Sequence, residues 1–243
     1  MPRRKEQFVN GEIYHVTVKR VKGLPLFADI DDKYRGVFSI YEFNTTKPVE
    51  IFKRRQARTN FKKVQLEGDR VSFIDSRDKL VEVLSFCLMP NHLHLLLRQL
   101  KENGITIFMN KLGAGYPAYF RKKHKITDKG YFFQSRFGAV RIETDEQLRV
   151  VFTYIHTNPI SLIEPKWKEM GIKNPKKAIE FVENYKWSSY QDFIGEENFP
   201  SVTEREFLSE TMGGAKGCKN AVNDWIKYKG KIKDHTHANL FLE

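Results

Sequence analysis

The chain has 243 residues, 40% of them hydrophobic and 13% aromatic, so it is long enough to bury a core in one or two domains. Its formal net charge of +12 predicts a polyanionic partner, because such a surplus otherwise destabilises a compact chain by self-repulsion. Nucleic acid comes first and an anionic membrane surface second. No apolar run approaches the roughly 20 residues that span a bilayer, which excludes a membrane-spanning helix.

The predicted location follows from the N-terminus and the cysteines. The opening segment MPRRKEQFVNGE is basic but has no apolar stretch after it, so we expect no signal peptide. Cys87 and Cys218 lie far apart and form no CxxC pair, which is typical of a reducing compartment and offers no zinc framework. We therefore expect a cytoplasmic protein.

The first third of the chain predicts one strand and one helix. Residues 11–21 alternate as in a strand, and residues 29–43 have the period of a helix. The apolar face expected for that helix consists of Ile30, Tyr34, Val37, Phe38 and Tyr41, with Gly36 as a weak point. Residues 47–79 are basic and weakly periodic, and we interpret them as an insertion, with a hairpin as one option.

The middle of the chain predicts a hairpin, a helix and a further strand. Two apolar strands, 80–89 and 92–99, flank the turn at Pro90 and Asn91, so they should pair in antiparallel fashion. Residues 104–125 predict a helix disturbed at Gly113 to Pro117 and basic at its end, and residues 130–143 predict another strand.

The clearest helix covers residues 145–157. Thr144 and Gln147 form the sequence pattern of a capping box, and Pro159 ends the helix. The succession strand, helix, hairpin, helix, strand, helix predicts an α+β fold with one antiparallel sheet, its helices on one face.

Two histidines stand out within the segment FCLMPNHLHLLLRQ. Because side chains alternate across a strand, His92 and His94 share one face with Leu96. The leucines between them form the other face. Alone, such a pair is more often structural than functional. The pair His235 and His237 lies in a polar, lysine-rich tail and is interpreted as loop or chain end.

The helix that follows supplies a second group of candidates. Tyr154 and Asn158 are four residues apart and lie on the same helical face. Two imidazoles and one amide oxygen would leave open positions on a divalent cation for phosphate oxygens, and a neighbouring tyrosine could then attack phosphorus. Taken singly, Tyr154 is more often a core aromatic and Asn158 a helix C-terminal residue.

Four segments in order, MPNHLHLLL, GYFFQSRFGAVRI, YIHTNPI and YKWSSYQDFIG, resemble the landmarks of single-tyrosine HUH transposases of insertion sequences and of REP-associated tyrosine transposases. The resemblance implies Tyr154 as nucleophile, with His92, His94 and Asn158 as ligands of Mg²⁺ or Mn²⁺. It also implies a ferredoxin-like (RRM-like) sheet and a substrate of single-stranded DNA folded into hairpins.

The domain limits follow from where the resemblance ends. We expect a catalytic domain over residues 1–195, interrupted by the insertion at about 47–79, and a C-terminal extension over residues 196–243. Residues 160–184 also depart from the family pattern, because a longer segment separates Pro159 from the WSSY landmark.

The expected activity is cleavage and rejoining of single-stranded DNA through a 5′-phosphotyrosine, leaving a free 3′-hydroxyl, by a monomer or homodimer. Expected backbone contacts are Lys122, Lys123, Arg136 and Arg141, and Phe132, Phe133 and Phe137 are available for base stacking. Two alternatives stay open at this point. One is a non-catalytic nucleic-acid-binding module of the same fold, and the other is a metal-dependent hydrolase that uses water.

Overall fold

A computed structural model describes residues 7–21, 24–49, 75, 77–128, 130–134 and 136–231. Its centre is a four-stranded sheet in the order β2-β3-β1-β4, and every neighbouring pair is antiparallel. The elements of this half are β1 (Ile13–Lys19), α1 (Ile30–Phe43), β2 (Val81–Met89), β3 (His92–Gln99), α3 (Gly104–Lys123) and β4 (Gly138–Ile142). This is the ferredoxin-like succession β-α-β-β-α-β, which confirms the predicted α+β class.

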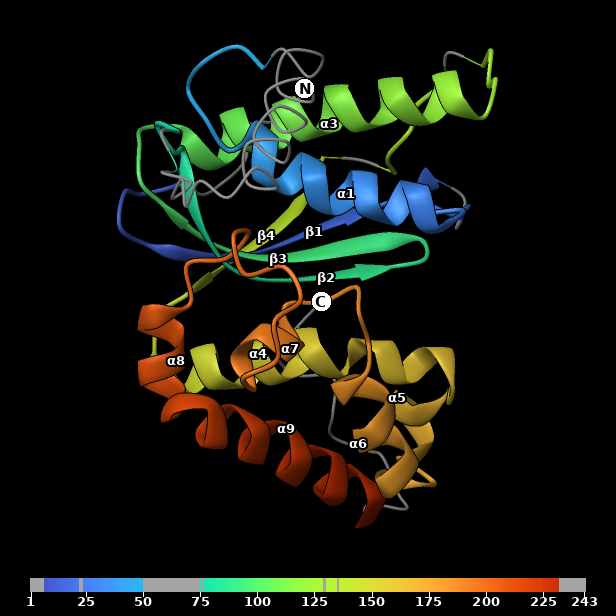
Figure 1. Cartoon of the computed structure of the whole chain (residues 1–243), viewed down its shortest axis with the longest axis vertical. Helices are drawn as coiled ribbons and strands as arrows, with labels where there is room; N and C mark the ends of the chain where they lie inside the picture. The colour runs from blue at the N-terminus through green and yellow to red at the C-terminus, as the bar shows by residue number, and fades with distance from the viewer. Residues whose placement is uncertain are drawn as a thin grey trace, which may run out of the picture.

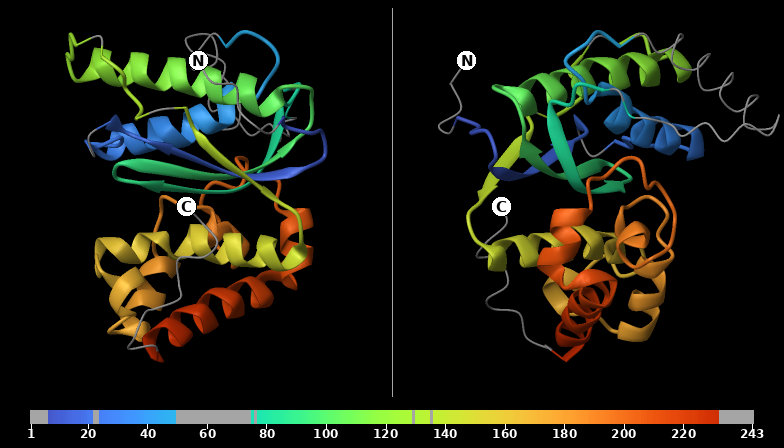
Figure 2. Two further views of the ribbon diagram at one scale, coloured as in Figure 1. Left: turned by 180° about the vertical axis from the view of Figure 1, so that it is seen from behind. Right: turned by 60° about the vertical axis from the view of Figure 1, so that its left-hand side comes forward.

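Helices cover both faces of the sheet, so the expectation of helices on one face alone was wrong (Figure 1). Helices α1 and α3 lie on one side, and α4 (Asp145–Thr157) crosses the other (Figure 2). Strand β2 gives the reason: eight of its nine residues are buried, and a strand buried on both faces needs cover on both.

The C-terminal helices complete the layer that contains α4. They are a 3₁₀ turn, η2 (Asn158–Leu162), followed by α5 (Trp167–Met170), α6 (Pro175–Glu183), α7 (Tyr190–Phe193), α8 (Glu206–Met212) and α9 (Gly214–Lys231). Helix α9 runs beneath α4 and buries Cys218, Val222 and Ile226 (Figure 1). None of the described helices has the length and apolar character needed to cross a membrane.

The buried face of α1 agrees only in part with the prediction, since Val37 and Tyr41 are buried as expected. Ile30 and Tyr34 are exposed, whereas Gly36 and Ile40 face the core. A Cβ on Gly36 would lie 2.5 Å from the ring of Phe27, so this face packs too closely for a side chain there. The glycine that weakens the helical pattern is therefore the residue that lets α1 approach its neighbours.

Two other elements differ in extent from their predictions. Helix α3 is unbroken and contains Pro117, so the predicted disturbance is absent. A Cβ on Gly115 would lie 2.3 Å from the ring of Phe43, so this glycine allows α1 and α3 to pack closely. Strand β4 is shorter than expected, because residues 130–134 form a loop with one isolated bridge between Phe133 and Arg20.

Local signals at the start of α4 are confirmed. Thr144 accepts a hydrogen bond from the Gln147 backbone N–H at 3.2 Å, and the Gln147 side chain accepts one from the Glu143 N–H at 2.8 Å. The first bond satisfies an N–H group of the first helical turn, which has no intrahelical partner, and the second joins the residue before the N-cap to the helix. The insertion at 47–79 lies mostly outside the described residues, as does the His235/His237 pair.

The WSSY landmark covers the outer edge of β2. The Leu88 N–H donates to the Trp187 carbonyl at 2.8 Å, and the Ser189 N–H donates to the Phe86 carbonyl at 3.0 Å. The Ser189 hydroxyl accepts from the Phe86 N–H at 3.0 Å and lies 3.0 Å from Nε2 of His156 on α4. This segment therefore ties the sheet edge to the helix that carries Tyr154.

Candidate active site

Three histidines gather where β1 and β3 face α4. The register pairs Thr17 with His94 and Lys19 with His92, so alternate residues of both strands point to the same side. His15, two residues before Thr17, shares that side, and its Nε2 lies 2.9 Å from Nδ1 of His94. His94 is 3% exposed and His15 5% exposed, so the pair is nearly dry.

Burial keeps these imidazoles neutral at physiological pH. It lowers the pKa of His15 to about 4, and burial together with the charges of Lys19 and Lys168 lowers the pKa of His92 to about 4. Burial lowers the pKa of His94 well below its usual value, and the other histidines add to the effect. Neutral imidazole is the form that binds metals, because it retains a lone pair.

In His92 and in His94, one ring nitrogen is engaged by a neighbouring side chain, and the other is left available to bind a metal. Nδ1 of His92 lies 2.7 Å from Oδ1 of Asn91, an oxygen that can only accept, so Nδ1 carries the hydrogen and Nε2 keeps its lone pair. His94 uses Nδ1 toward His15 and has an Nε2 that is buried without a hydrogen-bond partner. A nitrogen ligand commonly has its second ring nitrogen held in this way.

Tyr154 lies against these histidines from α4. Its ring meets that of His94 edge to face, with centroids 5.5 Å apart and planes at 87°, and its centroid is 5.9 Å from that of His15. The side chain is half-buried. The structure therefore brings Tyr154 into contact with the predicted His94, although the two are 60 residues apart in the sequence.

Asn158 follows one turn later, directly after α4. Its Nδ2 donates to the Tyr154 carbonyl at 2.9 Å, which leaves Oδ1 of this buried residue as an acceptor. Lys168 on α5 donates from Nζ to this oxygen at 3.4 Å and to the Tyr154 hydroxyl at 3.2 Å. An ammonium group thus lies between the predicted nucleophile and the predicted third ligand.

His15 and Lys168 are the site residues that the sequence argument missed. Strand β1 gave a usable signal, because His15, Thr17 and Lys19 are the polar positions of an alternating strand. The sequence offered no signal for Lys168, which depends on the turn η2 and on buried Trp167 to bring α5 back over Tyr154.

The donor set suits a divalent cation. It offers two neutral imidazoles and an amide oxygen, and the Nε2 of His94 is an orphaned buried atom that a bound ion would satisfy. His92, His94 and Asn158 are therefore the residues that could hold one. Their roles stay predictions.

A second group of possible metal ligands lies away from Tyr154. Asp29, Asp32 and His124 have ligand atoms within 4.8 Å of one another. Lys123 lies 2.5 Å from Asp29 and 3.1 Å from Asp32, and His124 lies 2.8 Å from Asp32. These contacts join the start of α1 to the end of α3, which accounts for the cluster as an ion-pair network.

The predicted nucleic-acid contacts are dispersed. Lys123 belongs to the network at Asp29, and Arg141 pairs with Glu12 at 3.0 Å. Lys122 and Arg136 are exposed. Phe132 is buried, with the Arg20 guanidinium 3.7 Å from its ring centroid, so it cannot stack on a base as expected.

The fold and site define an α+β domain in which a paired-histidine strand faces a tyrosine helix. Comparison with protein families agrees: residues 46–158 match the model described as "Transposase IS200 like". This stretch contains His92, His94, Tyr154 and Asn158, but neither His15 nor Lys168. This match, which spans residues 46–158, confirms the resemblance to IS200-like transposases seen in the sequence.

A solved structure described as "Structure of the REP associates tyrosine transposase bound to a REP hairpin" is also similar. The match covers 85% of this chain and 96% of that one, with 14% sequence identity and a TM-score of 0.43. A comparison with curated proteins finds no match.

Proposed function

We propose that this protein is a transposase-type endonuclease and strand transferase for single-stranded DNA, with Tyr154 as its nucleophile. The observation that carries the proposal is the edge-to-face contact of Tyr154 with His94, whose buried Nε2 has no partner. A ring packed only for stability would not require the two neutral imidazoles of His15 and His94 beside it. The family match over residues 46–158 and the net charge of +12 support DNA as the substrate.

In the proposed step, the Tyr154 oxygen forms a bond to the scissile phosphorus and the bond from phosphorus to the 3′ oxygen breaks. The tyrosine proton is lost to solvent and the 3′ oxygen gains one, giving a 5′-phosphotyrosine and a 3′-hydroxyl. The phosphodiester bond energy is kept, so the reverse step rejoins the strands without ATP. His92, His94 and Asn158 would hold Mg²⁺ or Mn²⁺, which when bound polarises the phosphate.

Lys168 places a positive charge at the attacking oxygen. Its Nζ donates to the Tyr154 hydroxyl at 3.2 Å and lies 4.7 Å from the ring centroid. In attack, this charge stabilises the negative charge that develops on the oxygen and on the phosphate. Lys168 belongs to residues 160–184, where the chain departs from the family pattern, so this contact is a feature of this chain's own sequence.

The domain limits also belong to this proposal: a catalytic domain over 1–195 with a basic insertion at about 47–79, and an extension over 196–243. The extension would support the nucleophile, since α9 packs against α4.

The test is a denaturing gel of labelled hairpin-bearing single strands incubated with the protein and Mn²⁺. A metal-dependent band of DNA linked to protein supports the proposal. Cleaved DNA without a linked band would favour the water-using hydrolase, and intact DNA would favour the non-catalytic binding module.

A further inference from the structure

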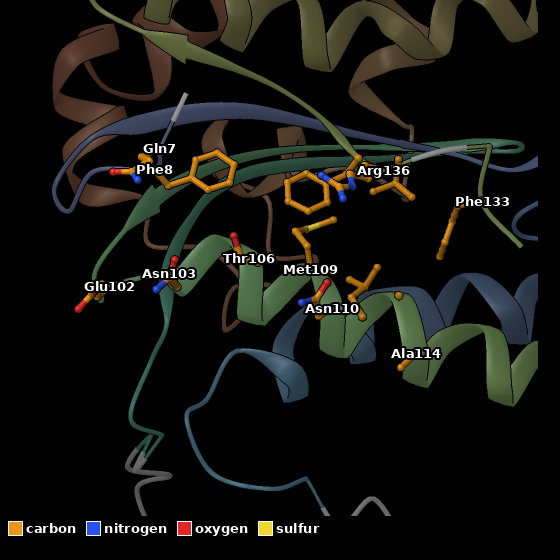
Figure 3. A pocket seen from close by; sticks show the side chains of 14 residues that line it. Gln7, Phe8, Glu102, Asn103, Thr106, Met109, Asn110, Ala114, Phe133 and Arg136 are labelled. Carbon is orange, nitrogen blue, oxygen red and sulfur yellow. The ribbon is translucent and has the colours of Figure 1, made fainter. Parts of the chain in front are cut away.

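A groove of about 1010 Å³ lies between α3 and the β1–β4 side of the sheet, away from Tyr154. Strand β1 separates the two regions: Val18 lines the groove, while its neighbours Thr17 and Lys19 point to the histidine side. Figure 3 shows α3 as one wall, with Thr106, Met109 and Asn110 directed toward the sheet.

Three aromatic rings line the groove from distant parts of the chain. Phe8 precedes β1, and Phe133 and Phe137 precede β4. The rings of Phe8 and Phe137 are nearly parallel, at 12°, with centroids 6.1 Å apart, and Phe8 is supported edge-on by Tyr14 at 4.8 Å. Phe133 and Phe137 are only half-buried, so ring surface reaches the groove.

The remaining lining is polar and includes one strong cation. The carboxamides of Gln7, Asn103 and Asn110 and the hydroxyl of Thr106 can donate and accept hydrogen bonds. Arg136 lies beside the rings, and Glu102 lies next to Asn103 at the opposite end (Figure 3). This combination suits a nucleotide. Aromatic rings can stack on the faces of the base, carboxamides can form hydrogen bonds with its edges, and a guanidinium can bind the adjoining phosphate.

We propose that this groove binds unpaired bases of the DNA substrate, so that one single strand lies in the groove and continues around β4 to Tyr154. The inference rests on the proposed function, since that function names the strand. The order of strands in the sheet allows this path. Strand β4 is the edge strand next to β1, so a DNA strand that leaves the groove can pass around β4 to reach the face that carries Tyr154. The volume is at the upper limit of the roughly 300–1,000 Å³ usual for small-ligand pockets, so an extended occupant fits.

Gly113 on α3 permits a sharp test, because it lines the groove and tolerates a side chain. A Cβ there would meet only the Phe133 ring, at the ordinary contact distance of 4.0 Å. Gly113→Ala should therefore fold normally, and Gly113→Leu should fill the groove without removing an existing contact. Ala118→Leu makes a similar change on the same helix at an exposed position outside the groove.

The experiment measures fluorescence anisotropy of the full-length variants with a labelled DNA single strand of mixed sequence, and with the same label on a blunt duplex, in EDTA. Gly113→Leu should weaken single-strand binding on the order of tenfold for each base displaced from an aromatic ring. Gly113→Ala and Ala118→Leu should bind like wild type, and duplex binding should be equal throughout. Thermal melting of each variant verifies folding.

Equal single-strand affinities for Gly113→Leu and Ala118→Leu would overturn the proposal, as would an equal loss for single strand and duplex. EDTA removes cleavage from the measurement, so the proposed function is tested separately by the covalent band. If the covalent band forms but Gly113→Leu has no effect on single-strand binding, only the groove proposal is refuted. If Gly113→Leu weakens single-strand binding but no covalent band forms, only the assignment of Tyr154 as nucleophile is refuted.

Discussion

The two faces of the sheet differ in what they bury. On the face toward α1 and α3, strand β3 presents Leu93, Leu95 and Leu97, each at most 3% exposed. On the face toward α4 it presents His92 and His94, which are joined by His15 from β1. The first face stabilises the fold by burying apolar side chains. The second face is less stabilising, because it buries polar imidazoles and keeps their nitrogens neutral and shielded from water.

This difference shows that neighbouring residues of one strand can have separate roles, one in packing the core and the other in binding. A substitution on the apolar face should change stability and leave binding alone. A substitution on the histidine face should do the reverse.

The largest effect is expected from His92→Ala, which should abolish Mn²⁺ binding measured by isothermal titration calorimetry. The folded state should be little affected, because His92 is only partly buried at the start of β3. His124→Ala is the matched control and should bind Mn²⁺ like wild type. Loss of binding in the control instead would place the ion at the Asp29–Asp32 cluster.

Leu95→Ala tests the opposite face. Leu95 is fully buried, so removing its side chain should lower the free energy of unfolding by about 2–5 kcal/mol, through lost burial and a residual cavity. Urea denaturation measures the change. At a temperature where the variant stays folded, its Mn²⁺ affinity should match wild type, and a large loss of affinity would show that the two faces are not separable.

The buried histidines of the sheet and of α4 should also make stability depend on pH. Burial lowers the pKa of His15 to about 4 and that of His156 to about 3, while the unfolded chain titrates near 6.5. Below 6.5 the unfolded state therefore binds more protons, so stability present above that pH is lost as pH falls toward about 4.

When lost in full, this contribution is about 3 kcal/mol for His15, complete near pH 4, and about 5 kcal/mol for His156, complete near pH 3. Urea midpoints measured across the window in EDTA provide the check. His156→Asn should flatten the dependence, and an unchanged profile in that variant would contradict the account.

The smallest effect is expected from Lys168→Met, which should slow formation of the covalent DNA species about fivefold, because one exposed charge interaction is worth about 1 kcal/mol. Lys168 is exposed, so the melting temperature should hardly change. Lys176→Met, at another exposed position within residues 160–184, serves as the control. Equal rates for the two variants would remove Lys168 from the mechanism.

Sequence reasoning succeeded where the signals were local. The β2–β3 hairpin, the capping box at Thr144 and the spacing of Tyr154 and Asn158 all depend on residues a few positions apart. It failed where packing between distant elements decides, as for the face of α1 at Gly36 and the continuous α3.

The site shows the same division. The spacing of His92 and His94 identified one strand, but the β1–β3 register that brings His15 to His94 is a long-range pairing. The groove likewise joins Phe8 to Phe137, which no periodicity connects.

The central claim is that Tyr154 forms a covalent bond to DNA. Mass spectrometry of the protein, digested after incubation with hairpin-bearing single strands and Mn²⁺, tests it most directly. The account predicts a nucleotide adduct on the peptide that contains Tyr154, and its complete loss in Tyr154→Phe, whose fold and Mn²⁺ affinity stay normal. Cleavage of the same DNA by Tyr154→Phe at the wild-type rate, or an adduct on another residue, would contradict it.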